Sequence, residues 1–234
     1  MSNLCIITAR GGSKRIPRKN IRDFLGKPII AYSIEAAISS GLYDEVMVST
    51  EDEEIAEISK QYGAAVPFMR SEATASDFAT TKDVLLEVLD EYEKRGRTFE
   101  IFSCIYPTAP FVTAEKLKAA YGKLISSDAD TLIPVIRFSF PPQRAFVIRD
   151  NGLEFQYPQY MNTRSQDLEP IYHDCGQFYF FRTDVYRGLI EGTGKILPLI
   201  VPEEETQDID NYSDWEIAEI KYVKYILKKK VSLV

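Results

Sequence analysis

The 234-residue sequence predicts an α/β fold, with a mainly parallel, Rossmann-like sheet flanked by helices on both faces. Short apolar runs typical of strands alternate along the chain with longer segments of helical periodicity. The first run, residues 4–8, leads directly into a loop rich in glycine and basic residues. This order of elements is typical of proteins whose ligands bind beyond the carboxyl ends of parallel strands.

The individual elements follow from periodicity and from start and stop signals. Apolar side chains recur at helical spacing over residues 29–38, and Gly41 is a plausible stop. Thr50 and Glu53 have the spacing of a capping box, which predicts a helix that ends near Tyr62. We further expect strands at 45–49, 66–68, 101–106, 131–137 and 177–182, and helices at 84–92, 114–126 and 213–230, the last opened by a capping box of Ser213 and Glu216.

Residues 138–175 interrupt this alternation and are rich in proline, glutamine, tyrosine and arginine. The triplet Asp150-Asn151-Gly152 predicts a β-hairpin over residues 145–157. We expect a single domain, 1–234, with 138–175 as an insertion that serves either as a lid over a ligand or as an arm exchanged between subunits. The loops after Thr8, Thr50, Tyr106 and Arg137 are then the ones expected to carry the chemistry.

Composition limits the functional classes. Hydrophobic residues make up 45% and charged residues 27% of the chain, as in an ordinary globular protein. The net charge of -7 disfavours nucleic acid as a partner. No apolar run approaches the ~18 residues of a membrane span, and the first residues do not resemble a signal peptide, so we expect a cytoplasmic protein without membrane association. The cysteines Cys5, Cys104 and Cys175 are expected to be buried free thiols.

The loop after the first predicted strand is the strongest local signal. It holds six basic residues and no acid between positions 10 and 22. Gly11 and Gly12 allow a tight bend whose amides can bind an anion. Arg10 can grip phosphate with two hydrogen bonds, whereas Lys14 and Lys19 would act as point charges. The loop is neither a Walker A motif nor a dinucleotide fingerprint, and a solvated basic loop is the alternative.

Asp208 and Asp210 form the second signal. In an extended segment they face the same side while Ile209 points into the core. Two carboxylates together with substrate phosphates suit Mg²⁺. The alternative is an acidic turn before a helix, with Asp210 or Asn211 as the cap. His173 is the only histidine, which excludes a histidine-based triad or a multi-histidine metal site.

Several motifs in the right order resemble the CMP-sialic acid synthetase (acylneuraminate cytidylyltransferase) family along nearly the whole chain. The opening motif stands as residues 9–14 with Lys19 and Asn20; further elements are residues 70–72, Asp77 with Thr80 and Thr81, residues 107–110, and Asp208-Ile209-Asp210 with Asp214-Trp215. More narrowly, residues 106–111, residues 138–145, and residues 162–168 together with 172–174 and 176–179 resemble the pseudaminic acid cytidylyltransferases. Sialic acid synthetases usually carry glutamine where Tyr106 stands and Asn-Gly where Cys175-Gly176 stands, which argues against sialic acid as the substrate.

The resemblance implies a nucleotidyltransferase fold and a Mg²⁺-dependent transfer of CMP from CTP to the anomeric hydroxyl of a nine-carbon acidic sugar, with release of pyrophosphate. It implies catalytic roles for Arg10, Lys14, Lys19 and Asp208, with Asp208 as candidate base, and Mg²⁺ ligation by Asp208 and Asp210. Nucleotide binding would involve Ala9, Arg10, Gly11, Gly12, Ser13, Lys14, Lys19, Asn20, Arg70, Asp77 and Thr80. Sugar binding would involve Tyr106, Thr108, Arg144, Arg164, Tyr172, His173 and Gln177, some of them supplied by the partner subunit of a homodimer through the 138–175 arm.

Three alternatives stay open at this point. The first is the same reaction on legionaminic or N-acetylneuraminic acid. The second is a nucleotidyltransferase that uses another triphosphate on a sugar phosphate. The third is a catalytically inactive nucleotide-binding module, against which the presence of both Asp208 and Asp210 argues.

Overall fold

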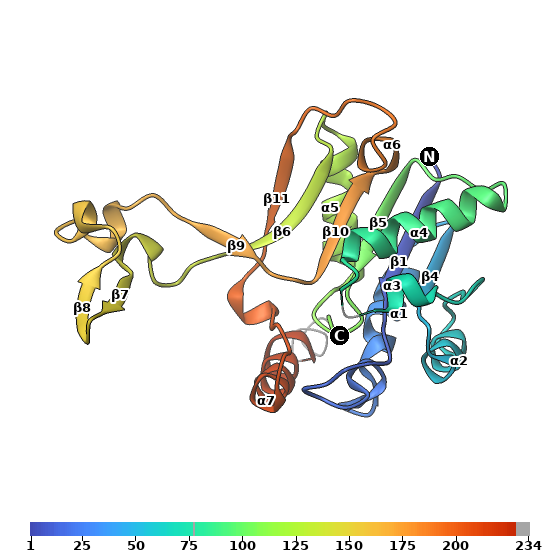
Figure 1. Cartoon of the computed structure of the whole chain (residues 1–234), viewed down its shortest axis with the longest axis horizontal. Coiled ribbons are helices and arrows are strands. Elements are labelled where there is room, and N and C mark those ends of the chain that lie inside the picture. The colour runs from blue at the N-terminus through green and yellow to red at the C-terminus, as the bar shows by residue number, and fades with distance from the viewer. Residues whose placement is uncertain (77, 228–234) are drawn as a thin grey trace.

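The computed structural model describes residues 1–76 and 78–227, in which a seven-stranded mixed sheet forms the centre (Figure 1). Its strand order is β11-β6-β10-β5-β1-β4, and β9 pairs with β6 beside this path. The strands are β1 (Asn3–Thr8), β4 (Glu45–Ser49), β5 (Ile101–Ile105), β6 (Thr131–Arg137), β9 (Tyr172–Asp174), β10 (Phe178–Arg182) and β11 (Ile196–Ile200). β1 runs parallel to β4 and β5, and β11 parallel to β6, whereas β10 lies antiparallel between β5 and β6. The mainly parallel sheet is thus confirmed.

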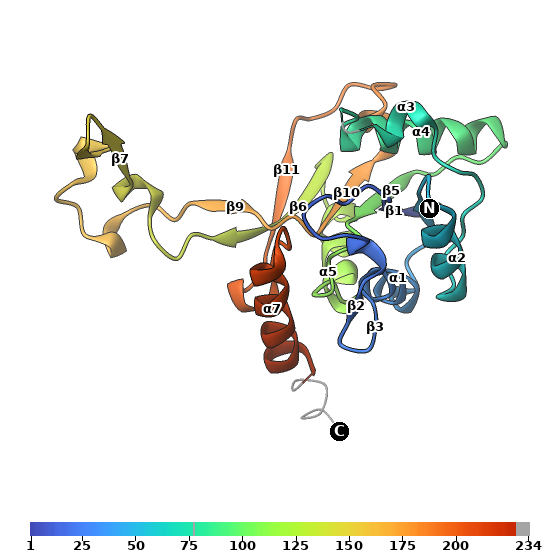
Figure 2. The same cartoon turned by 60° about the horizontal axis from the view of Figure 1, so that its bottom comes forward.

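Two apolar cores cover the faces of the sheet. Cys5 and Ile7 of β1 belong to the core under α1 (Ile29–Ser40) and α5 (Ala114–Ile125), whereas Leu4 and Ile6 belong to the core under α4 (Thr81–Lys94). This alternation follows from the two-residue period of a strand. Figure 2 shows α4 on one side of the sheet and α1 and α5 on the other.

A third core joins the C-terminal helix to the start of the chain. Helix α7 (Tyr212–Lys221) continues into a wider turn, Tyr222–Leu227, and packs Trp215 and Tyr222 against Phe24 and Ile16. Phe24 lies in a small hairpin of β2 (Asp23–Phe24) and β3 (Lys27–Pro28). Ile209 is 1% exposed within this core, as predicted. The segment that carries Asp208 and Asp210 is therefore fixed beside the basic loop.

The predicted arm extends away from the sheet (Figures 1 and 2). Its hairpin is formed by β7 (Phe146–Arg149) and β8 (Gly152–Phe155), and Asp150 and Asn151 both have positive φ, as a two-residue hairpin turn requires. The chain then returns through β9, which pairs with β6. The last three residues before Cys175 therefore belong to the sheet rather than to the insertion.

Several predicted boundaries are wrong. Residues 66–68 form no strand, because pairing with β4 stops at the single bridge of Ala65 and Pro67 has no N–H to continue it. Helix α2 (Glu53–Gln61) is capped by Asp52 rather than Thr50. Helix α7 is capped by Asn211, in a capping box with Asp214, rather than by Ser213. Its predicted end at Lys230 lies outside the described residues. Two short helices, α3 (Glu72–Ala75) and α6 (Thr183–Tyr186), complete the fold.

The three cysteines are buried and unbonded, as expected. Among the helices of residues 1–76 and 78–227, none has the length and apolar character that crossing a membrane requires.

Candidate active site

A pocket of about 360 Å³ opens beyond the carboxyl ends of β1 and β5. It is lined by loops that follow these strands and by the segment between α2 and α4. The lining residues are Thr8, Arg10, Ser13, Lys19, Asn20, Arg70, Thr74, Ser76, Ala79, Thr80, Thr81, Val84, Tyr106, Pro107 and Thr108. We call it the first pocket. The loops after Thr8 and Tyr106 border it, and the loop after Thr50 holds part of its lining in place. These are three of the four loops expected to carry the chemistry.

The loop that contains Gly11 and Gly12, here called the glycine loop, is held in place by hydrogen bonds within the chain. The amide of Gly11 donates a 2.7 Å hydrogen bond to the carboxylate of Glu51, and the side chain of Asn20 donates to the carbonyl of Arg10 at 2.8 Å. The amide of Ser13 donates to the carbonyl of Gly11. The Gly11 amide therefore supports the loop instead of pointing to a ligand. An anion would instead be attracted by the cationic side chains that line the pocket, among them Arg10 and Lys19.

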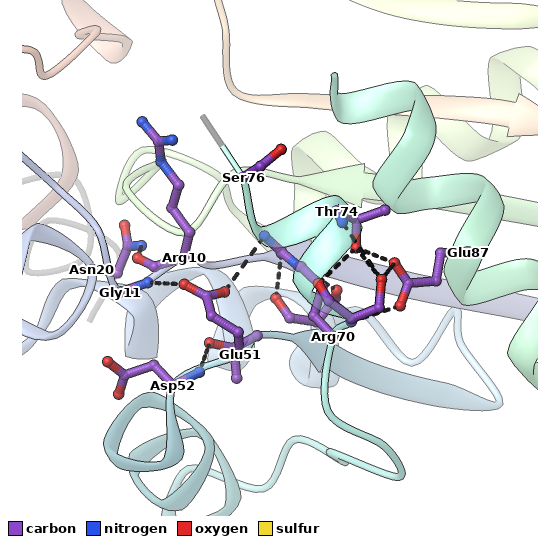
Figure 3. A network of polar contacts seen from close by, with 12 residues as sticks. Arg10, Gly11, Asn20, Glu51, Asp52, Arg70, Thr74, Ser76 and Glu87 are labelled. Carbon is purple, nitrogen blue, oxygen red and sulfur yellow. Dashed lines mark hydrogen bonds and ion pairs between the residues drawn. The ribbon is translucent and has the colours of Figure 1, made fainter. Parts of the chain in front are cut away.

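Glu51 also connects the loop to Arg70 (Figure 3). The guanidinium of Arg70 is buried, donates to the side chain and the carbonyl of Ser49, and lies 3.8 Å from the Glu51 carboxylate. Burial lowers the pKa of Arg70, and Glu51 partly offsets this effect. Arg70 thus presents a fixed, partly desolvated cation to the first pocket, where an anionic ligand would interact strongly with it.

The acid pair meets the basic loop directly. Lys19 donates from Nζ to the carbonyl of Ile209 at 2.6 Å and lies 4.0 Å from the Asp210 carboxylate, to which Arg15 also donates. Burial lowers the pKa of Lys19, although the two aspartates oppose this. Partial burial and the charge of Asp210 raise the pKa of Asp208. Arg10, Lys19, Asp208 and Asp210 therefore converge on one edge of the sheet.

A second pocket of about 490 Å³ contains Asp208 and His173. Its lining also includes Ile136, Asp174, Cys175, Gly176, Glu203, Thr206, Gln207 and Lys221. Lys221 donates to the carbonyls of Glu203 and Thr206 and to the side chain of Gln207, so helix α7 holds the loop that precedes Asp208. Asp208 thus reaches into this pocket while the basic loop, bound to Ile209 and Asp210, borders the first.

Several residues expected at the site are not among those that line the first pocket. Lys14, Ala9, Gly11 and Gly12 do not line the first pocket, and Asp77 lies outside the described residues. Arg144 bonds to Ser165 and Arg164 to Asp167, all on the arm. Tyr172 is exposed on β9. Gln177 is 1% exposed and donates to Thr206, so within one chain it holds the loop that precedes Asp208 and lines neither pocket.

A family model described as "Cytidylyltransferase" matches residues 4–187, which is most of the chain. The chain belongs to the cytidylyltransferase family. The match spans β1 with its glycine loop, the lining of the first pocket and β10, but it ends before Asp208.

Curated relatives extend the similarity of this cytidylyltransferase to its C-terminal part. A "Pseudaminic acid cytidylyltransferase" of Campylobacter jejuni is 41% identical over 227 residues, which cover 95% of this chain and 97% of that protein. A "CMP-N,N'-diacetyllegionaminic acid synthase" of Legionella pneumophila is 32% identical over 230 residues, 94% and 95% of the two chains. An "N-acylneuraminate cytidylyltransferase" of Streptococcus agalactiae is 30% identical, with 92% of this chain and 52% of that protein covered.

Solved structures agree with the fold of the cytidylyltransferase. A CMP:2-keto-3-deoxy-manno-octonic acid synthetase complexed with CTP matches with a TM-score of 0.71 at 18% identity, covering 97% of this chain and all of that one. A 4-diphosphocytidyl-2C-methyl-D-erythritol synthase from Anaerococcus prevotii gives 0.64 at 14% identity, with 95% and 98% covered. At these identities the similarity establishes a nucleotidyltransferase-type fold only.

Sequence reasoning missed two residues that hold the cytidylyltransferase site together. Glu51 directly follows Thr50, at the end of a strand already singled out, and pairing of Thr8 with Ser49 in the sheet places it opposite the glycine loop. Its position after Thr50, in one of the loops expected to carry the chemistry, was the feature of the sequence that could have identified it. Lys221 had no comparable signal, because its role depends on the path of the 203–207 loop against α7.

Proposed function

We propose that this cytidylyltransferase transfers CMP from CTP to the anomeric hydroxyl of pseudaminic acid and releases pyrophosphate. The observation that carries the proposal is the first pocket, where Arg10, Lys19 and Arg70 surround a space next to an acid pair. The choice of sugar rests on the 41% identity to a pseudaminic acid cytidylyltransferase, against 32% and 30% to the legionaminic and neuraminic relatives. Transfer to legionaminic or N-acetylneuraminic acid is the second candidate.

The reaction needs no covalent enzyme intermediate. The anomeric oxygen of the sugar attacks the α-phosphorus of CTP, the bond from that phosphorus to the bridging oxygen breaks, and pyrophosphate leaves. Arg10, Lys19 and Arg70 counter the negative charge of the triphosphate, while Asn20 holds the carbonyl of Arg10 and so the loop. Positioning and charge neutralisation of this kind supply most of the acceleration in phosphoryl-type transfers.

The attacking hydroxyl loses its proton to Asp208 in this scheme. The position of Asp208 in the lining of the second pocket, next to His173, suits a sugar bound there with its anomeric carbon toward the first pocket.

Mg²⁺ fits the donor set of Asp208 and Asp210. In the described residues no cluster of three or more acidic, histidine or cysteine side chains offers a complete metal cage. Mg²⁺ does not require one, because it is bound by one or two carboxylates with substrate phosphates and water. The charge of Asp210 makes ionisation of Asp208 less favourable and so raises the pKa of Asp208, an effect that a bound cation would relieve. When bound, Mg²⁺ would supply charge neutralisation of the triphosphate.

The arm supports a homodimer. The cross-strand neighbours Ile148 and Leu153 of its hairpin are 77% and 66% exposed. A two-stranded hairpin with an exposed apolar face is marginally stable alone, so a second copy is the occupant we propose for it. Arg144 and Arg164, which lie on the arm, would then reach the sugar carboxylate in the partner's site, where a bidentate arginine suits a carboxylate.

Pyrophosphate release with CTP and a panel of pseudaminic, legionaminic and N-acetylneuraminic acids tests the proposal. We expect kcat/KM to be highest with pseudaminic acid and turnover to require CTP. Asp208→Ala and Asp210→Ala should each lower kcat by at least ~100-fold, whereas Glu216→Ala, an exposed acid on α7, should not. Turnover with another triphosphate, or full activity of both aspartate variants, would refute the mechanism.

A further inference from the structure

The two pockets take part of their walls from two loops that are far apart in the sequence. The 106–111 loop follows β5 and contributes to the first pocket Tyr106, Pro107 and Thr108. The 203–207 loop leads into Asp208 and contributes to the second pocket Glu203, Thr206 and Gln207. The separation of these two loops therefore sets the separation of whatever the two pockets bind.

Lys116 joins the two loops. It lies in the first turn of α5, where its backbone amide donates to the cap residue Thr113. Its ammonium donates to the carbonyl of Phe111 and to the carbonyl of Glu205, each at 3.1 Å. The same ammonium lies 3.2 Å from the Glu205 carboxylate, with which it forms an ion pair. One side chain thus binds both loops.

This bridge is largely buried. The side chains of Lys116 and Glu205 are each 13% exposed, so solvent and salt screen their attraction little. Phe111, whose carbonyl is one of the acceptors, is fully buried in the third core. An exposed ion pair would tether the loops loosely, whereas a buried one fixes the distance between them.

A second bridge connects the same loops through neutral groups. The amide of Tyr106 donates to the carbonyl of Gln177 at 2.9 Å, and the side chain of Gln177 donates to the Thr206 hydroxyl at 2.7 Å. Gln177 and Thr206 are 1% and 3% exposed. Since Lys116 belongs to α5 and Gln177 directly precedes β10, two separate elements of the fold hold one pair of loops.

We propose that Lys116 and Gln177 are positioning residues that set the distance between the two bound substrates. Transfer requires the attacking oxygen of the sugar to lie ~3–3.5 Å from the α-phosphorus of CTP, and a shift of about 1 Å can lower the rate about 100-fold. Among the described residues that line the two pockets, neither Lys116 nor Gln177 occurs, so the affinity for each substrate depends on other side chains. The inference rests on the proposed function, in which the sugar occupies the second pocket.

Single-turnover and steady-state kinetics of Lys116→Met and Gln177→Met test this inference. Methionine keeps the length of each side chain but cannot make its hydrogen bonds. We expect the single-turnover rate of CMP transfer to fall about 10-fold in each variant and about 100-fold in the double variant, with KM for CTP and for pseudaminic acid changed less than about threefold. Lys116→Arg, which keeps a charged donor, should recover part of the rate. An unchanged rate, or a loss confined to one KM value, would overturn the inference.

Lys123→Met is the matched control. Lys123 lies on the same helix and also donates from Nζ to a carbonyl at 2.6 Å, but that carbonyl belongs to Pro198 in β11, outside both loops. Its replacement removes the same charge from α5 and should leave the rate of CMP transfer at the wild-type value. A loss equal to that of Lys116→Met would refute the role of the bridge.

Two further outcomes have a defined meaning. Removing one partner of a buried ion pair can prevent folding, which thermal unfolding would show, and Lys116→Met combined with Glu205→Gln, which removes both charges, then takes the place of the single variant. Wild-type turnover of legionaminic or N-acetylneuraminic acid in place of pseudaminic acid would refute the proposed sugar alone, since the variants are then compared with the accepted sugar. Absence of turnover with all three sugars would refute both proposals.

Discussion

The guanidinium of Arg15 donates a 2.7 Å hydrogen bond to the Asp210 carboxylate, which lies 195 positions further along the chain. Both side chains are partly exposed, 67% and 41%, so the pair contributes little to stability. Its position matters more than its energy. Arg15 neutralises one of the two carboxylates that would hold Mg²⁺, and the metal must compete with it.

Replacing Arg15 should therefore strengthen metal binding. In Arg15→Gln, we expect the half-saturating Mg²⁺ concentration to fall about two- to fivefold, the range that an exposed ion pair allows. The measurement is initial rate against Mg²⁺ at saturating CTP and sugar. Arg18→Gln removes the same charge from the same loop, but Arg18 bonds to Asp52 and Glu54, so its Mg²⁺ dependence should stay unchanged. A higher Mg²⁺ requirement in Arg15→Gln would show that Arg15 assists the bound state instead.

The ionised side chain of Asp208 should lower the free energy of unfolding at neutral pH. Its pKa in the fold is raised, so its neutral form favours folding, and this contribution is lost as pH rises through the raised pKa. Asp208→Asn should thus raise the melting temperature at pH 7 by about 1 °C, a small amount because solvent still reaches the partly buried side chain, and the difference should vanish near pH 3. Mg²⁺ should stabilise the wild type but not the variant. Glu216→Gln, an exposed acid on α7, is the control, and a variant less stable than wild type at pH 7 would contradict the assignment.

Glu51 should affect the binding of CTP but not the binding of the sugar. Glu51→Ala leaves the Gly11 amide without its acceptor and removes the carboxylate beside Arg70, so we expect KM for CTP to rise about 5- to 30-fold, with KM for the sugar unchanged. Glu51→Gln keeps an acceptor for Gly11 and should recover part of the loss. Glu57→Ala, on the exposed face of α2, should behave as wild type. A selective effect on the sugar KM would disprove this role.

Ile148→Glu should separate the proposed dimer. A charge on the exposed face of the hairpin cannot be buried without a large desolvation cost, so light scattering should report a monomer where the wild type is a dimer. Turnover should fall because Arg144 and Arg164 of a partner are lost. Lys60→Glu, on α2, provides a charge change on the body of the molecule and should remain dimeric. A monomeric wild type with full activity would exclude the partner's contribution.

The elements that could be predicted from sequence are those specified by local signals. The hairpin at Asp150 and Asn151 needs only its turn residues, and helix α1 needs only its periodic apolar face and Gly41 in the left-handed conformation. Burial of Ile209 between Asp208 and Asp210 followed from the two-residue period of an extended segment.

The elements that could not be predicted depend on tertiary neighbours. β11 contains Pro198, and its outward-facing Ile196 and Ile200 are 59% and 60% exposed, so its sequence lacks the alternation of a half-buried strand. β9 is only three residues long, and it forms a strand because it pairs with the last three residues of β6. In the site, Glu51 and Lys221 act through contacts across the fold, which no spacing in the sequence reveals.

The two segments that lead into and out of the arm are joined by sheet pairing of Arg137 with Tyr172 and of Ile136 with His173. Changes within the segment between these positions should therefore leave the register of β6 and β9 unshifted. Chimeras that graft the segment between Arg137 and Tyr172 from a relative with another sugar preference should therefore fold, and they offer a modular way to redirect the enzyme toward new acceptors.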